Sequence, residues 1–404
     1  MLYQFTGGQD GGIPVAALTV DGGGRLYGTA AYGGNTGGSC SAGGCGTVFR
    51  LVHNNSGWSF TTLHSFTGWA LGEGGDGANP TAKLVFGPDG ALYGTTLVGG
   101  GPNCQFQSGN PGCGTVFRIT PPTTVIGNWN ETVLARFEGD LDGGYPDGEL
   151  VFDPEGNIYG SASGWGEFGN GAIYVLQPHG MLLGLYEFTG GADGANPTGV
   201  VFDGFGNLYG TAFYGGTFNS DTCLMGCGTV FELIPNIGFW DLNLLYSFQS
   251  GSDGANPVGA IFDSGNLYGP AKNGGQGSFG GTVYELTAPS WGFNLIYTFI
   301  MQTGVYGYGP SDKLTMDAAG NLYGTTTGDG AYSYGNVFEL TPSGGGWIYT
   351  DLYDFTGGAD GGNPTGGVVL DSKGNLFGTT GGGGDFSGKC LYSSGCGVIF
   401  EITR

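Results

Sequence analysis

The chain repeats one pattern of short apolar segments separated by turns rich in glycine, aspartate, asparagine and proline. Between residues 197 and 248 these segments read PTGVVFD, GNLYGTAF, GTVFELI and FWDLNLLYSF. Each places β-branched or aromatic residues in alternation over a short stretch, which is typical of strands. A turn such as DGFGN joins the first two segments, because glycine adopts the positive φ of a tight hairpin. The pattern predicts a four-stranded antiparallel meander.

Seven copies of this unit fill the chain. The aromatic residue of an L-Y-G step marks the second strand of each copy and recurs at intervals of 66, 66, 50, 59, 55 and 54 residues. These aromatic residues are Tyr27, Tyr93, Tyr159, Tyr209, Tyr268, Tyr323 and Phe377. Apolar residues do not recur with helical spacing over three turns in any window, so we expect an all-β protein.

Both faces of each predicted sheet carry apolar side chains. In the fourth copy, Phe231 and Leu233 point to one face, and Val230 and Ile234 point to the other. Each sheet must therefore lie between two neighbours, as in a seven-bladed β-propeller with four antiparallel strands in each blade. A parallel β-helix is the alternative, but its coils are shorter and lack tight four-stranded meanders.

The two ends of the chain indicate how the ring closes. The opening MLYQFTGGQDGG matches the end of a repeat, LYEFTGGADGA from Leu185, whereas the last copy stops after its third strand. We therefore expect residues 1–6 to complete the last blade, in a 3+1 arrangement. The predicted single domain, 1–404, has blades at 13–68, 79–138, 146–189, 196–249, 256–300, 309–356 and 363–404 plus 1–6.

The charge and the apolar content of the chain exclude some classes of binding partner. Ten Lys and Arg against 33 Asp and Glu give a net charge of −23, which disfavours binding to nucleic acid and to anionic lipid surfaces. No apolar stretch reaches the roughly 20 residues of a membrane span, so we expect no membrane insertion. The first residues lack the basic and apolar regions of a signal peptide, which suggests a mature or truncated product.

The signature D-x-x-G-N-L-Y-G-T-T, followed by a Gly-rich stretch and G-T-V-F-E-L-T, resembles the Gloeobacter–Verrucomicrobia repeat family of secreted and surface-anchored bacterial proteins. The best matches are FDGFGNLYGTA with CGTVFELIP in the fourth copy, and MDAAGNLYGTT with NVFELTP in the sixth. The third copy departs most, reading GAIYVLQP from Gly171. The resemblance covers the whole chain and implies an exported protein, extracellular or at the cell surface.

Eight cysteines fall in four local pairs, each just before a third strand. The pairs are Cys40 with Cys45, Cys104 with Cys113, Cys223 with Cys227, and Cys390 with Cys396. This regularity favours disulfides that close the long loops in an oxidising compartment. The alternative, a zinc site, would need C-x2-C pairs or adjacent histidines, which the spacing lacks.

An aspartate also recurs in the loop before the first strand of six copies. These are Asp10, Asp76, Asp142, Asp193, Asp253 and Asp360, whereas Tyr306 takes this place in the sixth copy. We expect them on the face that carries the cysteine loops, where a ring of carboxylates would suit calcium. The simpler interpretation is that each aspartate caps its own Asp-Gly turn through backbone amides two residues on. The aspartates of the first hairpin (Asp21, Asp153, Asp203, Asp263, Asp317 and Asp371) have the same explanation, and neither set justifies a metal assignment.

Signals of catalysis are sparse. The three histidines, His53, His64 and His179, occupy different positions of the repeat, and none accompanies a known catalytic motif. The repeat is broken at residues 171–177 and at Tyr306, and neither break gathers a nucleophile and a base. A tryptophan recurs at the start of the outer strand (Trp58, Trp129, Trp240, Trp291 and Trp347), which favours packing between blades over sugar stacking.

These observations predict a non-catalytic extracellular scaffold protein that associates with itself. Donation of residues 1–6 to the last blade of a neighbour would build an open filament. The alternative is a surface propeller that binds a carbohydrate or another cell-surface ligand, and a polysaccharide hydrolase or lyase is the third hypothesis. No cofactor is expected, although calcium would suit the carboxylate-rich face.

Overall fold

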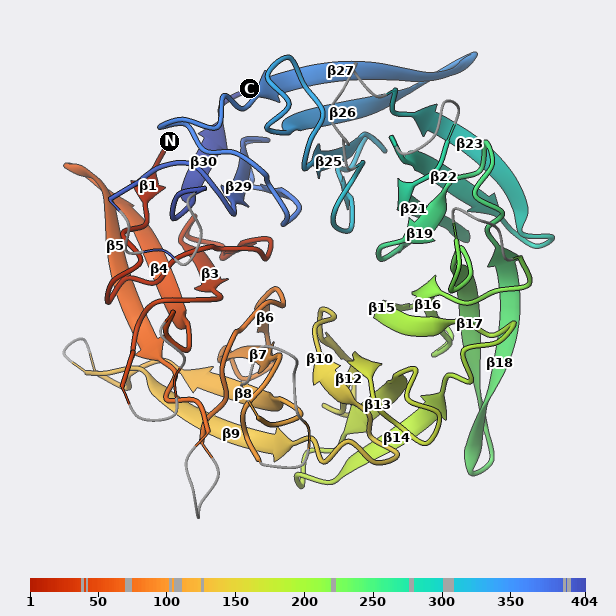
Figure 1. The fold of residues 1–404 in the computed structure, drawn as a ribbon, viewed down its shortest axis with the longest axis horizontal. Helices are drawn as coiled ribbons and strands as arrows, with labels where there is room; N and C mark the ends of the chain where they lie inside the picture. Colours follow the sequence, from red (N-terminus) through yellow and green to blue (C-terminus); the bar gives the residue numbers. More distant parts are fainter. Residues whose placement is uncertain are drawn as a thin grey trace.

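Seven sheets stand around a central axis in the computed structural model (Figure 1). The structure describes residues 1–37, 40, 43–69, 75–101, 104, 111–124, 127–218, 223–275, 280–300, 309–387, 390 and 394–404. The predicted all-β, seven-bladed propeller is therefore confirmed. Within these ranges, no helix has the length and apolarity of a membrane span.

Each blade is a meander whose first strand lies nearest the axis and whose last strand lies at the rim (Figure 1). Blade 1 contains β2 (Thr19–Val20), β3 (Leu26–Ala30), β4 (Thr47–Asn54) and β5 (Gly57–Ser65). Blade 2 contains β6 (Val85–Phe86), β7 (Leu92–Thr96), β8 (Thr115–Thr120) and β9 (Asn130–Arg136). Blade 3 contains β10 (Gly144–Pro146), β11 (Val151–Phe152), β12 (Ile158–Gly164), β13 (Ala172–Leu176) and β14 (Leu182–Glu187).

The remaining blades follow the same order. Blade 4 contains β15 (Ala195–Phe202), β16 (Leu208–Tyr214), β17 (Thr229–Asn236) and β18 (Phe239–Ser247). Blade 5 contains β19 (Ala255–Pro257), β20 (Ile261–Asp263), β21 (Asn266–Asn273), β22 (Thr282–Thr287) and β23 (Gly292–Thr298). Blade 6 contains β24 (Thr315–Met316), β25 (Leu322–Thr326), β26 (Asn336–Ser343) and β27 (Gly346–Asp354). Blade 7 contains β28 (Val369–Leu370), β29 (Leu376–Thr380), β30 (Val398–Ile402) and β1 (Tyr3–Gln4).

The glycine of the L-Y-G step allows close packing in each sheet. Gly210 of β16 pairs with Phe231 of β17, and a Cβ added at Gly210 would lie only 2.5 Å from Cζ of the Phe231 ring. A larger residue here would displace a ring that is fully buried. The glycine that all seven copies share at this step therefore makes room for the aromatic core of each blade.

The outer tryptophans pack between neighbouring blades, as the repetition predicted. Trp240 of blade 4 lies 6.2 Å from Tyr159 of blade 3, and Trp291 of blade 5 lies 5.5 Å from Tyr209 of blade 4, measured between ring centroids. Trp129, Trp347 and Trp58 contact Tyr27, Tyr268 and Phe377 in the same way. The L-Y-G aromatic of one blade is thus covered by the tryptophan of the next.

A second contact between blades uses the residue before the repeat's proline. Asn79 adopts a φ of 55°, donates its backbone N–H to the carbonyl of Cys45, and donates its side-chain amide to the carbonyl of Ala31. Asn196, Asn256 and Asn363 share this left-handed conformation and make the corresponding two bonds. Asparagine suits the position because it tolerates positive φ and supplies the extra donor.

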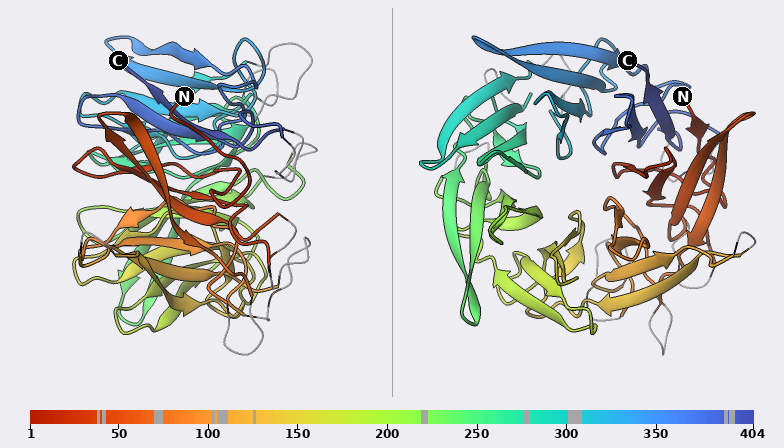
Figure 2. Two further views of the ribbon diagram at one scale, coloured as in Figure 1. Left: turned by 90° about the vertical axis from the view of Figure 1, so that its left-hand side faces the viewer. Right: turned by 180° about the vertical axis from the view of Figure 1, so that it is seen from behind.

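The N-terminal strand closes the ring, as predicted, and the two ends of the chain lie close together at this closure (Figures 1 and 2). In the register of β1 with β30, Tyr3 lies opposite Ile399 and Gln4 opposite Val398. The backbone N–H of Phe5 donates to the carbonyl of Gly397 at 3.1 Å, and Phe5 is fully buried. In each other blade, a phenylalanine at the end of the outer strand makes the equivalent bond to a glycine carbonyl. Blade 7 therefore repeats the design of the others with a strand from the opposite terminus.

Candidate functional site

The recurring loop aspartates cap turns, but in a direction that differs from the prediction. The Asp193 carboxylate accepts bonds from the backbone N–H of Thr189, four residues earlier, and from the hydroxyl of Tyr186. Asp10, Asp253 and Asp360 repeat both bonds, with Tyr3, Tyr246 and Tyr353 as the hydroxyl donors. The predicted bond to an amide two residues on is wrong here, because the loop folds back over its aspartate. In the first hairpin it is confirmed, for example from Phe205 N–H to Asp203.

The eight cysteines form four disulfides: Cys40–Cys45, Cys104–Cys113, Cys223–Cys227 and Cys390–Cys396. The second cysteine of a pair accepts a backbone bond from the loop of the following blade, as Cys45 does from Asn79 and Cys227 from Asn256. The cysteine loops and aspartate loops therefore lie on one face. Four disulfides indicate an oxidising, extracytoplasmic compartment.

The axis of the ring holds a pocket of about 410 Å³ whose wall is built from the first segment of the blades. The residue three positions after the repeat's proline lines this pocket in six of the seven blades, the exception being Gly367 of blade 7. The residue is small or apolar in four blades, where it is Ala17, Val200, Ala260 or Gly367. In the other three it is Lys83, Glu149 or Lys313, so the charges are a departure from the repeat.

These three charged side chains meet across the axis. Glu149 of blade 3 contacts Lys83 of the adjacent blade 2, with 2.9 Å between Oε1 and Nζ. Its other oxygen, Oε2, lies 3.2 Å from Nζ of Lys313. Lys313 comes from blade 6, on the opposite side of the ring (Figure 1). The three groups form an ionic bridge over the axis.

The surroundings of Glu149 and Asp147 shift the pKa values of these two pocket residues in opposite directions. Burial raises the pKa of Glu149, but the charges of Lys313 and Lys83 outweigh it and lower the pKa to about 2. Asp147 also lines the pocket, and its carboxyl reaches the open space although it lies deep within the ring. This burial raises the pKa of Asp147 to about 7, although a hydrogen bond with Ser163 acts in the opposite direction.

Asp312 has a structural role in the same wall. Its carboxylate accepts two hydrogen bonds of 2.7 Å, one from the backbone N–H of Gly367 in blade 7 and one from the backbone N–H of the adjacent Lys313. Burial raises the pKa of Asp312 above its ordinary value despite these bonds. Glu149 and Asp312 are thus held by protein groups, whereas Asp147 presents a carboxyl to the pocket.

A second hollow of about 510 Å³ opens beside the axial pocket at blade 3. Leu97 and Asp147 line both spaces, so the two lie side by side at these residues. Trp165 forms part of the wall, is 37% exposed, and packs its ring against Tyr145 at 6.3 Å between centroids. An indole face, a carboxyl group and the amide-bearing Asn196 therefore surround one space.

The other sequence candidates do not join this pocket. His53 is exposed near the end of β4 and His179 is exposed in a turn. Residues 171–177 contain β13, which pairs with both β12 and β14, with a register shift at Ile173/Tyr174 on the β14 side. His64 lies at the interface of blades 1 and 2, where its Nε2 is 2.9 Å from Oδ2 of Asp76. Tyr306, the second predicted break, lies outside the described residues.

The axial charges were missed by motif searching because they belong to no known motif. A signal was nevertheless present: aligning the seven copies on their prolines places Lys83, Glu149 and Lys313 in one column of otherwise small or apolar residues. Trp165 is likewise found by alignment, since it lies where blades 1, 2, 4 and 7 have their cysteine loops.

Solved structures similar to this one are propellers of low sequence identity. A protein of Bacteroides uniformis assigned as a 6-phosphogluconolactonase has a TM-score of 0.52 and 15% identity, and the match covers 88% of each chain. The extracellular domain of a B. thetaiotaomicron protein assigned as a one-component system has a TM-score of 0.52 and 10% identity over 92% of this chain and 37% of that one. A puromycin-hydrolyzing peptidase of Mycobacterium tuberculosis has a TM-score of 0.53 and 11% identity, over 90% of this chain and 48% of that one. At such identity these similarities support the fold alone.

Sequence comparison identifies the family. No curated protein matches the chain. The model of the Gloeobacter/Verrucomicrobia repeat matches residues 73–224 and 219–404, which is most of the chain and includes the blades that carry the axial charges. The chain is a member of the Gloeobacter/Verrucomicrobia repeat family.

Proposed function

We propose that the protein is a non-catalytic binding propeller of the cell exterior, which takes a carbohydrate at the pocket formed by Asp147 and Trp165. The observation that carries the proposal is the replacement of small or apolar wall residues by Lys83, Glu149 and Lys313 at the axis. Four blades occupy the same position without a charge, so the ring does not need them to close. Placing charges in a partly enclosed site costs desolvation energy, so we interpret their presence at only three of seven equivalent positions as a sign of binding.

The chemistry of the wall suits a polyhydroxyl ligand. Lysine ammonium groups and the Asn196 amide are donors, and the Asp147 carboxyl accepts or donates according to its protonation. The exposed indole of Trp165 offers a flat apolar surface for the C–H face of a sugar ring. The axial pocket and the adjoining hollow each have a volume typical of small-ligand sites.

A glycan array probed with the disulfide-intact full chain tests the proposal, followed by calorimetry with each glycan that binds. We expect Trp165→Ala and Asp147→Asn to weaken binding at least tenfold. Phe205→Ser is the matched control, because Phe205 is 93% exposed at a hairpin and lines neither pocket, so binding should persist. An array without a bound glycan, with and without calcium, would refute the carbohydrate proposal. Turnover of a bound glycan that Asp147→Asn abolishes would refute its non-catalytic part.

A scaffold role through self-association is the second candidate, favoured by the seventh blade. Its outer strand, β1, pairs through only two residues, whereas the outer strands of blades 1, 4 and 6 each contain nine. A strand held by so few bonds is suited to exchange between copies. Electron microscopy and light scattering of purified protein test this role: filaments or concentration-dependent oligomers support it, and monodisperse monomers up to millimolar concentration refute it.

A further inference from the structure

The interface of blades 1 and 2 departs at two facing positions from the arrangement shared by the interfaces of blades 7 and 1, 4 and 5, and 5 and 6. In blades 3, 4, 5 and 6, the outer-strand residue opposite the β-branched residue of the third strand is a tyrosine, as in the pair Val230–Tyr246. In blade 1, the equivalent pair is Val48–His64. Where Tyr246 donates its hydroxyl to the loop aspartate Asp253, His64 contacts the loop aspartate Asp76.

The second departure faces the first from the next blade. The outer-strand residue opposite the leucine or isoleucine of the third strand is Phe60, Leu242, Phe293 or Tyr349 in blades 1, 4, 5 and 6. In blade 2 it is Glu131, opposite Ile119. Where this residue is aromatic, it stacks on the tyrosine of the preceding blade, with 4.7 Å between the Tyr246 and Phe293 centroids. At the interface of blades 1 and 2, an imidazole and a carboxylate replace this stacked pair.

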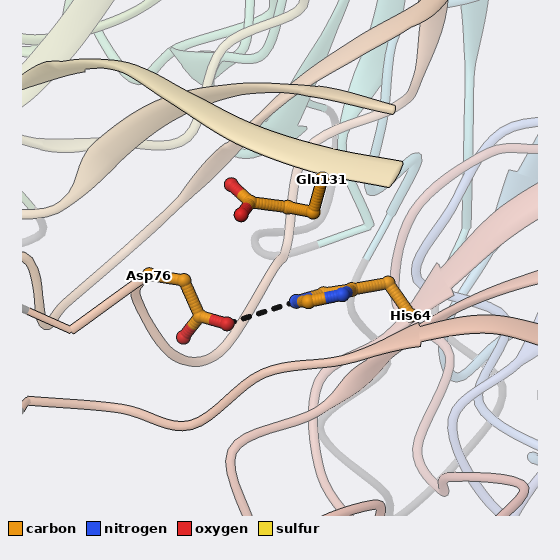
Figure 3. A group of neighbouring side chains, drawn as sticks. All are labelled: His64, Asp76 and Glu131. Atoms are coloured by element: carbon orange, nitrogen blue, oxygen red, sulfur yellow. Dashed lines mark hydrogen bonds and ion pairs between the residues drawn. The ribbon is translucent and has the colours of Figure 1, made fainter. Parts of the chain in front are cut away.

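The resulting cluster brings together His64, Asp76 and Glu131 from three segments (Figure 3). One ligand atom of each side chain lies within 4.8 Å of the other two. Asp76 is held in place by the backbone N–H and the hydroxyl of Thr67, both 2.7 Å from its Oδ1, which leaves Oδ2 facing His64. The Oε1 atom of Glu131 is buried without a hydrogen-bond partner. An unsatisfied carboxylate oxygen beside an imidazole is costly unless a proton or a cation accompanies it.

We propose that His64, Asp76 and Glu131 bind a divalent transition-metal ion, with zinc as the best fit, and that this ion joins blade 1 to blade 2. One imidazole and two carboxylates match the ligand chemistry of zinc, and the two carboxylates balance the charge of the ion. Two ligands of a tetrahedral zinc lie about 3.3 Å apart, given bonds of about 2.0 Å, and His64 Nε2 and Asp76 Oδ2 are 2.9 Å apart. The imidazole disfavours calcium, which prefers oxygen ligands only.

Burial raises the pKa of Glu131 to about 7, although the nearby His64 acts to lower it. This is the direction expected for a carboxyl that lacks its counter-charge. The site needs nothing from the axial pocket, so the proposal is independent of the carbohydrate function.

The experiment uses untagged full-length protein with its disulfides intact, first dialysed against a chelator and then titrated with zinc chloride in competition with a chromophoric chelator. We expect one zinc per chain, and a Co²⁺-loaded sample should show the visible absorption of tetrahedral coordination. His64→Gln and Glu131→Gln should each weaken zinc affinity more than about 100-fold, since they remove direct ligands. The matched controls are His53→Gln and His179→Gln, which replace exposed histidines and should leave affinity unchanged.

The double variant His64→Tyr with Glu131→Phe separates loss of metal from loss of fold, because it restores the Tyr–Asp–Phe arrangement of the interface between blades 4 and 5. It should fold, bind no zinc, and lose the zinc-dependent rise in melting temperature of the unmodified protein. Zinc binding that survives this double variant would overturn the assignment. The assignment would also be overturned if the metal-free protein takes up no zinc, or if these ligands bind calcium in preference to zinc.

Discussion

Glu149 of the third blade and Lys313 of the sixth blade form an ion pair across the axis of the ring, with 3.2 Å between Oε2 and Nζ. The two residues are 164 positions apart in the chain. Together with Lys83, this pair ties opposite sides of the propeller to one another. The bridge therefore contributes to stability in a way that contacts between neighbouring blades do not.

The first prediction concerns the pH dependence of this bridge. Because the two lysines lower the pKa of Glu149 to about 2, the ionised carboxylate stabilises the fold fully above its unfolded pKa of about 4.5. This contribution is lost as the pH falls from about 4.5 towards 2. Glu149→Gln should remove that part of the pH dependence and lower the free energy of unfolding at pH 7 by about 2 kcal/mol, since the lysines lose their counter-charge. Urea unfolding of both proteins at several pH values measures the difference.

A compensating variant is the control for this prediction. Replacing Lys83, Glu149 and Lys313 together with alanine restores the small side chains of the other blades, and should recover most of the stability lost in Glu149→Gln. The prediction fails if Glu149→Gln and the unmodified protein lose stability in parallel between pH 4.5 and pH 2.

The second prediction concerns closure by Phe5. This side chain is fully buried, and its ring lies 5.2 Å from Phe49 of blade 1 between centroids. Phe5→Ala should lower the free energy of unfolding by about 3–4 kcal/mol, as expected for a large cavity in a packed core. Hydrogen exchange of the Leu2 and Phe5 amides, which bond to Ile399 and Gly397, should also become faster.

Phe248→Ala in blade 4 is the matched control, because Phe248 occupies the equivalent position directly after β18, in a blade whose four strands follow one another in the chain. It should cost similar stability without accelerating exchange at Leu2. If Phe5→Ala costs less than about 1 kcal/mol, the N-terminal strand does not close the ring in solution.

The fold was predictable from the sequence because seven copies of one strand pattern leave few ways to bury both faces of a sheet. The closing strand was predictable for the same reason: Leu2 to Thr6 match the segment that ends every other blade. The two sites were not predictable from motifs. Lys83, Glu149 and Lys313 stand out when the copies are aligned, but only the ring geometry places blade 3 opposite blade 6. His64 and Glu131 become a pair only once neighbouring blades are superimposed on their strand register.

The turn-capping aspartates show where local reasoning is insufficient. An aspartate in an Asp-Gly turn commonly bonds to an amide two residues on, and Asp203 does so. Asp193 bonds instead to Thr189, four residues earlier, and to Tyr186 on the outer strand. The partner is decided by the path of the loop over the end of the blade, which the local sequence does not encode.

The last prediction tests the asparagine contact between blades. Ile13 occupies the position of Asn79 before the repeat's proline and adopts the same φ of 55°, which a β-branched residue tolerates poorly. Asparagine at this position would relieve that strain and supply a side-chain donor, as Asn363 does towards Thr327, at the cost of the buried methyl groups of Ile13. Ile13→Asn should therefore raise the free energy of unfolding by about 1 kcal/mol. The reverse change, Asn79→Ile, should lower it by about 2 kcal/mol through the same terms. Urea midpoints of the two variants measure both effects, and a loss of stability in Ile13→Asn together with a neutral Asn79→Ile would show that the left-handed position does not limit stability.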